Sequence, residues 1–140
     1  MKKNILSILI LTFFFATVCV QGGTITVQVY GIKEIKGKVV IGLYKNPKNF
    51  PEVGKQYKGI ITKVTTKSAT YTFIDVPDGH YAIALFHDIN SNGKLDYSFF
   101  GIPEELYAFS CITKTCFKTP KFHEAKFKFK DKHKLKIKLK

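Results

Sequence analysis

The C-terminal segment alternates between lysine and apolar residues, which constrains its fold strongly. From Lys126 to Lys140 every even position is lysine. The apolar residues occupy odd positions: Phe127, Phe129, Leu135, Ile137 and Leu139. A period of two places successive side chains on opposite faces of a β-strand, whereas a helix has a period of 3.6. We therefore predict two strands, separated by a turn at Asp131–His133, with one face sealing a core and the other covered by ammonium groups.

The same period of two recurs upstream. It predicts further strands at residues 24–30, 37–44, 60–66 and 70–76. Residues 81–86 are almost wholly apolar, which predicts a strand covered on both faces. Pro77-Asp78-Gly79 predicts a turn, because Pro fixes φ and Gly accepts a positive φ. Residues 45–59 contain two prolines and two glycines and are predicted to form a long loop. The spacing of strands and turns is typical of an all-β sandwich of about seven strands.

The composition supports one compact domain. The chain has 140 residues, of which 45% are hydrophobic, including 13 Phe and 7 Tyr, so it can build a core. This length excludes a multidomain enzyme. A dinucleotide-binding domain is excluded as well, because the glycine-rich fingerprint of that fold is absent.

The first residues have the layout of a secretory signal peptide. Lys2 and Lys3 precede a weakly polar to apolar stretch that ends at Val20, and Gly22 and Gly23 follow it. We predict a signal peptide at residues 1–22 and a single β-sandwich domain at 23–140. The alternatives are a retained membrane anchor and a lipoprotein acylated on Cys19. Cleavage predicts a secreted, periplasmic or cell-envelope protein without a membrane span.

The two remaining cysteines are predicted to form a structural disulfide. Cys111 and Cys116 are separated by four residues, and an even count suits an oxidising compartment. A catalytic or metal-binding thiol pair is the alternative. It is disfavoured because Cys-x-x-Cys spacing and a nearby histidine are both missing from this loop.

The lysine face predicts attraction to an anionic envelope surface. The positions concerned are Lys126, Lys128, Lys134, Lys136 and Lys138. Lipid, surface polysaccharide and nucleic acid are the possible anionic partners, and salt would weaken each contact. The alternative is a solvated face that protects an edge strand. Sequence-specific nucleic-acid binding is not expected, because the chain has no arginine.

The segment HDINSNGKLD at residues 87–96 carries the chemistry of a calcium loop. The predicted ligands are Asp88, Asn90, Asn92 and Asp96, joined by Glu105 or Glu104. Oxygen ligands at alternate positions before a glycine are how a tight loop surrounds Ca²⁺. The match to an EF-hand is partial, because Phe99 occupies the twelfth position. The alternative is a strand connection whose Asx side chains bond their own backbone.

An enzymatic interpretation is weaker. A small hydrolase could use His87 and Asp88 with Glu105, Glu104 or Ser110, but no nucleophile elbow surrounds Ser110. His80 and His123 have no partner at the spacing of a zinc site. We therefore expect no catalytic set.

Three linked motifs resemble the bacterial family of domain of unknown function 2141 (DUF2141): HDINSNGKLD at 87–96, GIPEELYAFS at 101–110 and PKFHEAKF at 120–127. The resemblance implies a secreted or envelope β-sandwich, immunoglobulin-like or prealbumin-like, with no established activity. We expect a non-enzymatic binding or structural domain stabilised by Ca²⁺. The alternatives are the hydrolase at the His87/Asp88/Glu105 rim and a cationic adhesin that uses the lysine-rich strands.

Overall fold

A computed structural model describes residues 22–111 and 119–140. Its regular elements in chain order are β1 (Gly23–Tyr30), β2 (Lys38–Tyr44), β3 (Lys58–Lys63), β4 (Ser68–Val76), β5 (Gly79–Asp88), β6 (Tyr107–Phe109), α1 (Phe122–Ala125), β7 (Phe127–Phe129) and β8 (Lys132–Lys138). In this part of the chain, no helix has the length and apolar character that crossing a membrane requires. The predicted all-β class is confirmed.

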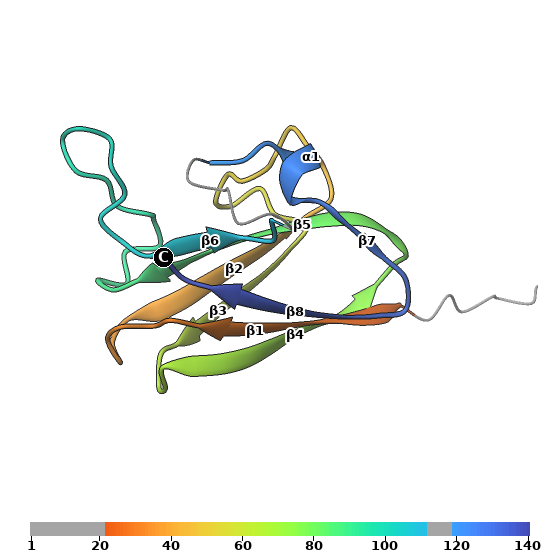
Figure 1. Ribbon diagram of the computed structural model, residues 1–140, viewed down its shortest axis with the longest axis horizontal. Coiled ribbons are helices and arrows are strands. Elements are labelled where there is room, and N and C mark those ends of the chain that lie inside the picture. The colour runs from red at the N-terminus through yellow and green to blue at the C-terminus, as the bar shows by residue number, and fades with distance from the viewer. Residues whose placement is uncertain (1–21, 112–118) are drawn as a thin grey trace, which may run out of the picture.

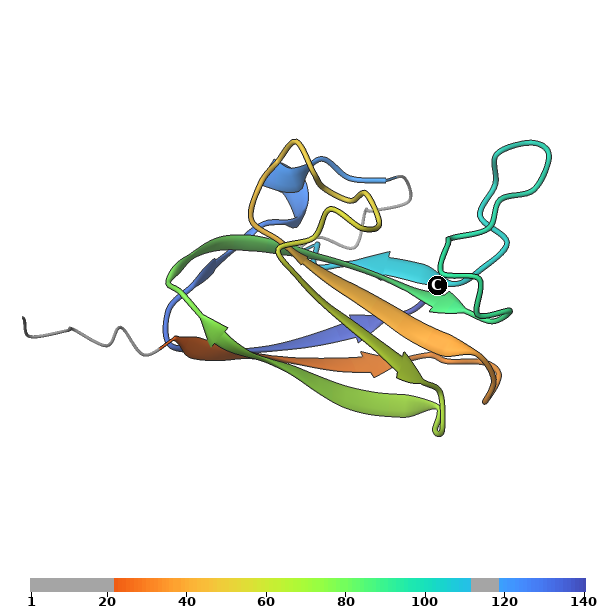
Figure 2. The same ribbon diagram turned by 180° about the vertical axis from the view of Figure 1, so that it is seen from behind.

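The strands form two sheets that lie face to face (Figures 1 and 2). The three-stranded sheet has the order β4-β1-β8, in which β1 is antiparallel to β4 and parallel to β8. The five-stranded sheet has the order β3-β2-β5-β6, and β7 pairs with the first residues of β5. This arrangement confirms the β-sandwich prediction.

The core lies between the sheets and follows from the alternation of each strand. Ile25, Val27 and Val29 of β1 are fully buried, while the residues between them are half-buried. Strand β5 is mostly buried on both faces, because a second apolar cluster covers its outer face. Predicted strands 24–30 and 81–86 therefore have the expected burial.

The second cluster packs a loop and a helix onto the five-stranded sheet. Its buried members are Tyr44, Phe50, Ala82, Phe122 and Ala125. The Phe50 ring makes edge contacts with Tyr44 at 5.3 Å, with Phe109 at 5.9 Å and with Phe122 at 5.9 Å between ring centroids. These contacts attach the β2–β3 loop and α1 to the outside of the sheet.

The predicted turns need two corrections. The turn predicted at Asp131–His133 is confirmed at Asp131, which has a φ of 60° and connects β7 in one sheet to β8 in the other. Its predicted end is wrong, because β8 begins at Lys132 and includes His133. Before β5, the predicted turn lies at Pro77-Asp78, but Gly79 begins β5 without a positive φ, and the left-handed residue nearby is Asp75 of β4, with a φ of 52°.

Candidate functional site

A groove of about 490 Å³ lies on the outer face of the five-stranded sheet. Its floor is formed by side chains of β5 and β6: Ala84, Phe86, Tyr107 and Phe109. One wall is residues 51–53 of the β2–β3 loop, and the other is the connection between β5 and β6, from Gly93 to Pro103. The lining is mainly apolar and aromatic, which is the usual character of a ligand-binding cleft.

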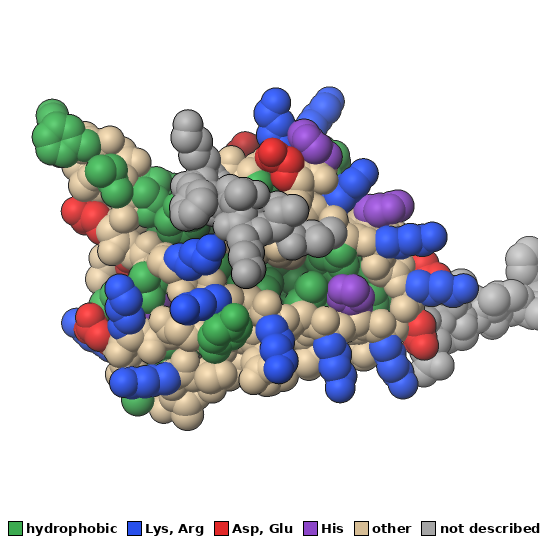
Figure 3. Space-filling view, in the orientation of Figure 1, with side chains coloured by type: hydrophobic (Ala, Val, Ile, Leu, Met, Phe, Trp, Pro, Cys, Tyr) green, Lys and Arg blue, Asp and Glu red, His purple; other side chains and the backbone are tan. Residues whose placement is uncertain are grey.

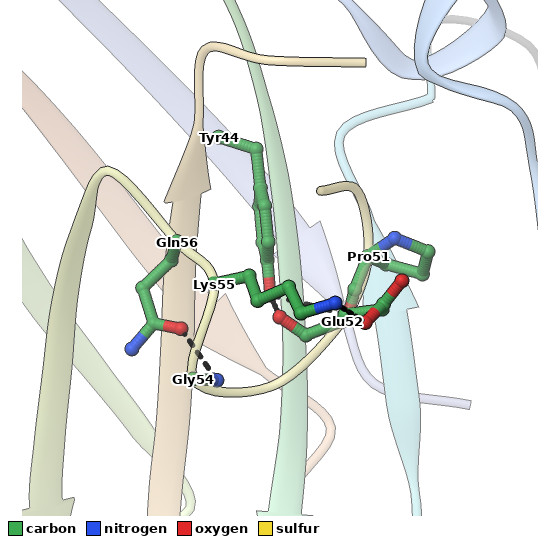
Figure 4. A network of polar contacts seen from close by, with 6 residues as sticks. All are labelled: Tyr44, Pro51, Glu52, Gly54, Lys55 and Gln56. Carbon is green, nitrogen blue, oxygen red and sulfur yellow. Dashed lines mark hydrogen bonds and ion pairs between the residues drawn. The ribbon is translucent and has the colours of Figure 1, made fainter. Parts of the chain in front are cut away.

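The first wall is held by hydrogen bonds from the end of β2. The Tyr44 hydroxyl lies 3.1 Å from the Pro51 carbonyl oxygen and 3.0 Å from that of Glu52, beneath the loop (Figure 4). Beyond it, the Gly54 N–H donates to Gln56 Oε1 at 2.8 Å, and Lys55 pairs with Glu52 at 2.6 Å. The loop therefore keeps a fixed shape without regular secondary structure.

The same burial changes the acidity of Tyr44. Desolvation, with a contribution from the negative charge of Glu52, raises the pKa of this phenol to about 12. Tyr44 thus remains a neutral hydroxyl throughout the physiological range and supports the loop by its hydrogen bonds.

The second wall begins with the predicted calcium loop, and Asp88 organises it from beneath. The Asp88 carboxylate is 1% exposed and accepts the Asn92 N–H at 3.1 Å and the Gly93 N–H at 2.9 Å. Gly93 adopts a φ of 78°, which allows the backbone to curl over that carboxylate. A buried carboxylate needs such partners, because an unpaired charge in the interior is costly.

Glu105 closes the loop from the other side. Its carboxylate is 7% exposed and accepts the Ile89 N–H at 2.8 Å and the Asp96 N–H at 3.3 Å. Across the loop, the side-chain amides of Asn90 and Asn92 donate to Asp96, at 2.6 Å and 3.0 Å. Glu104, the other predicted contributor, is exposed.

The structure therefore brings the predicted ligands other than Glu104 into one hydrogen-bonded cluster: Asp88, Asn90, Asn92, Asp96 and Glu105. In this arrangement their oxygens accept bonds from the loop itself, as the alternative interpretation of an Asx-rich connection expected. Within residues 22–111 and 119–140, no three His, Cys, Asp or Glu side chains are grouped so that they could hold a metal ion. A cation here would need asparagine or backbone oxygens as well.

Beyond the groove, the second wall extends into an exposed aromatic tip. The β5–β6 connection projects from the sandwich (Figure 1), and its apolar end stands clear of the surface (Figure 3). Phe99 is 98% exposed, Phe100 85% and Ile102 64%. The tip is closed by a turn in which the Gly101 N–H donates to the Ser98 carbonyl at 2.9 Å. Apolar exposure of this extent is uncommon on a soluble surface.

A model of a protein family, described as an uncharacterized protein conserved in bacteria (DUF2141), matches residues 27–137. The chain belongs to the DUF2141 family. The match begins within β1, ends within β8 and confirms the resemblance seen in the three motifs. No curated protein and no solved structure matches the chain.

In this DUF2141 domain, the geometry argues against the alternative of a hydrolase built on His87, Asp88 and Ser110. His87 and Asp88 are neighbours in β5, so their side chains point to opposite faces of the sheet. The His87 ring is fully buried, and its Nε2 lies 2.7 Å from the Lys36 carbonyl oxygen. Ser110 is also buried and donates to the Ala125 carbonyl at 2.7 Å. These residues do not converge on a shared reaction centre.

Two predictions fall on residues outside the described part of the chain. The predicted signal peptide covers residues 1–22, of which the structure describes Gly22, so it stays a prediction. Cys116 lies in the segment that is not described, so its disulfide with Cys111 stays a prediction.

His80 and His123 both line a second hollow of about 640 Å³ beside α1.

Sequence reasoning missed the groove, although it singled out one of its walls. The floor residues come from β5 and β6, and the opposite wall comes from a loop about 40 positions upstream in the chain. The available signal was the aromatic pair Tyr107 and Phe109, whose period of two places both rings on one face of β6. That signal predicts an aromatic face on β6, but it does not predict which other segments of the chain surround this face.

Proposed function

We propose that this protein is a non-enzymatic binding domain of the bacterial cell envelope, which takes a ligand with a flat apolar face into the groove over β5 and β6. The groove itself is the observation that carries the proposal. Phe86, Tyr107 and Phe109 form an aromatic floor between two walls that the fold fixes. Export is supported by the predicted signal peptide at residues 1–22.

The groove is tested with the apolar dye ANS, whose fluorescence rises on binding apolar surface. Ala84→Leu fills the floor of the groove, and we expect it to weaken dye binding about tenfold, since a ligand and the added side chain compete for the same volume. The matched control is Phe99→Ser with Phe100→Ser, which removes the exposed tip and leaves the groove intact. Dye binding lost in the tip variant and retained in Ala84→Leu would overturn the proposal.

We propose further that Ca²⁺ stabilises the wall formed by HDINSNGKLD. The support is the hydrogen-bonded cluster in which Asp88, Asp96 and Glu105 each accept bonds from the loop, with the Asn90 and Asn92 amides donating to Asp96. Within the described residues these carboxylates are not grouped as a metal site by themselves, so asparagine or backbone oxygens would complete the coordination. Carboxylate and amide oxygens are the ligands that Ca²⁺ prefers. The ion would replace the hydrogen bonds between the two asparagines and Asp96.

Calorimetric melts with millimolar Ca²⁺ and with chelator test this part. An ion present at 100 times its Kd stabilises the folded state by about 2.7 kcal/mol, which raises Tm by several degrees. Glu105→Gln and Asp96→Asn should each abolish the rise, whereas Glu104→Gln, the exposed neighbour, should keep it. If the melts of the unmodified protein with Ca²⁺ and with chelator coincided, the calcium proposal would be wrong, and the groove proposal would be unaffected.

A further inference from the structure

The outer face of the three-stranded sheet is a flat array of polar and cationic side chains. Since Ile25, Val27 and Val29 point into the core, the residues between them on β1 point outward. The register then places Lys134 beside Thr26 and Lys136 beside Gln28, with Thr72 and Thr70 on the far side. Thr26 and Thr72 lie 3.4 Å apart between their hydroxyl oxygens. We call this surface the lysine–threonine face.

The lysines of this face form a line along one edge. Lys132, Lys134, Lys136 and Lys138 are all exposed and lie on β8, an edge strand of its sheet. Alternate residues of a strand are about 6.7 Å apart, so the lysine side chains leave the backbone of β8 at that spacing. Figure 3 shows lysine side chains gathered in a row along β8.

The centre of the face holds no acidic side chain. The segments Thr24–Tyr30, Ser68–Thr72 and Lys132–Lys138 contain no Asp or Glu, and the exposed Asp75 and Asp131 lie at one end, where β1 begins. In the described part of the chain, none of the β8 lysines from Lys132 to Lys138 is in an ion pair. A hollow of about 500 Å³ lies at the centre of the face, lined by Thr26, Gln28, Thr70, Lys134, Leu135 and Lys136.

We propose that the lysine–threonine face binds a linear acidic polysaccharide, with its carboxylates on the lysine line and its hydroxyls on the Thr and Gln side chains. A line of point charges suits a polymer whose acidic groups repeat regularly. The adjoining hydroxyl and amide groups can donate and accept hydrogen bonds with sugar hydroxyls. The hollow at the centre gives a sugar ring a place beside Lys134 and Lys136.

The same surface is less suited to the other anionic partners. Nucleic acid is bound through bidentate arginines or through several stacked aromatic rings. The chain has no arginine, and Tyr30 is the aromatic residue among the outward positions of β1. A bilayer favours a contiguous apolar patch. The exposed apolar residues Tyr30 and Ile74 lie at opposite ends of the face.

Binding to polygalacturonate, measured by titration calorimetry at low salt, tests the proposal. Lys134→Gln with Lys136→Gln should weaken binding about tenfold or more, because two charges at the centre are lost. The matched control, Lys126→Gln with Lys128→Gln, removes the same charge from exposed positions around β7, in the other sheet. It should weaken binding less than about threefold. If the two double variants lost the same affinity, binding would depend on net charge alone, and the proposed site would be wrong.

A second pair of measurements separates the ligand classes. Thr26→Val with Thr70→Val leaves the charge unchanged and should weaken polygalacturonate binding about threefold or more, because hydroxyl partners are lost. Unchanged affinity would overturn the role of the hydroxyls. A single-stranded oligonucleotide or vesicles of anionic lipid that bind more tightly than polygalacturonate would overturn the choice of polysaccharide, as would the absence of polygalacturonate binding at low salt.

Discussion

At the scale of single residues, burial decides which polar groups support the groove. Tyr44 is 3% exposed and Glu105 7%, and each side chain bonds two backbone groups of a loop that lies outside the two sheets. Backbone groups buried without partners are costly, so these side chains act in place of a strand ladder. The two walls of the groove thus depend on a few individual side chains.

We predict that Tyr44→Phe destabilises the protein by about 1–2 kcal/mol at pH 8, because both carbonyls lose their hydroxyl donor. The pKa of Tyr44 rises from 10.0 in the unfolded chain to about 12 in the fold. The folded state therefore holds the proton more tightly, so this stabilisation is complete below about pH 10 and is lost as the pH rises through 12.

Urea unfolding of both proteins at pH 8 and pH 11.5 measures this effect. The difference in the free energy of unfolding between the unmodified protein and Tyr44→Phe should shrink at the higher pH. The exposed Tyr57 supplies the control, since Tyr57→Phe removes a hydroxyl from the surface and should change the free energy of unfolding at pH 8 by only a small amount. A difference for Tyr44→Phe that stays constant with pH would contradict the prediction.

At the scale of elements, the end of β5 is positioned by the β1–β2 connection. Gly37 adopts a φ of 68°, and a Cβ there would lie 2.2 Å from the Asp88 carbonyl oxygen and 2.6 Å from that of Ile89. The connection therefore packs against the backbone from which the HDINSNGKLD loop departs. This close approach requires glycine on two grounds, conformation and space.

Gly37→Ala should be much more destabilising than Gly54→Ala. Gly54 has a φ of 88° with open space around its missing Cβ, so alanine there meets only the conformational cost of about 1–2 kcal/mol. At Gly37 the clash adds about 1–3 kcal/mol, because backbone must move. Denaturant midpoints of the two variants give the comparison, and similar midpoints would show that the β5 end can shift freely.

At the scale of the whole molecule, charge opposes folding. The formal net charge is +13, and one ion pair, between Lys55 and Glu52, lies within the described residues. Such an excess of one sign destabilises the compact state by self-repulsion, which salt screens. The apolar sandwich core must offset this repulsion.

We therefore expect Tm to rise by a few degrees between 20 mM and 300 mM NaCl. A variant with Lys126, Lys128 and Lys130 changed to Gln carries less charge and should show a smaller rise. Scanning calorimetry of both proteins provides the measurement. A Tm that is independent of salt, or that falls, would show that repulsion among the lysines is unimportant for stability.

The sequence alone determined the class of fold and the direction of most side chains. In a strand, side chains at odd and even positions point to opposite faces. The alternation of lysine with Phe127, Phe129 and Ile137 was therefore enough to predict which residues are buried. The Asx loop could likewise be recognised, because its hydrogen bonds join residues close together in the chain. The family followed from the same local motifs.

Only the tertiary structure decided how these strands combine. The alternation of apolar and polar residues does not predict that β7 pairs with β5 while β8 pairs with β1 in the other sheet, because each pairing depends on partners distant in sequence. The groove arises in the same way, from a loop near Pro51, the floor at Phe86 and the wall at Leu95. Local chemistry fixes what each segment presents, and long-range packing fixes which segments meet.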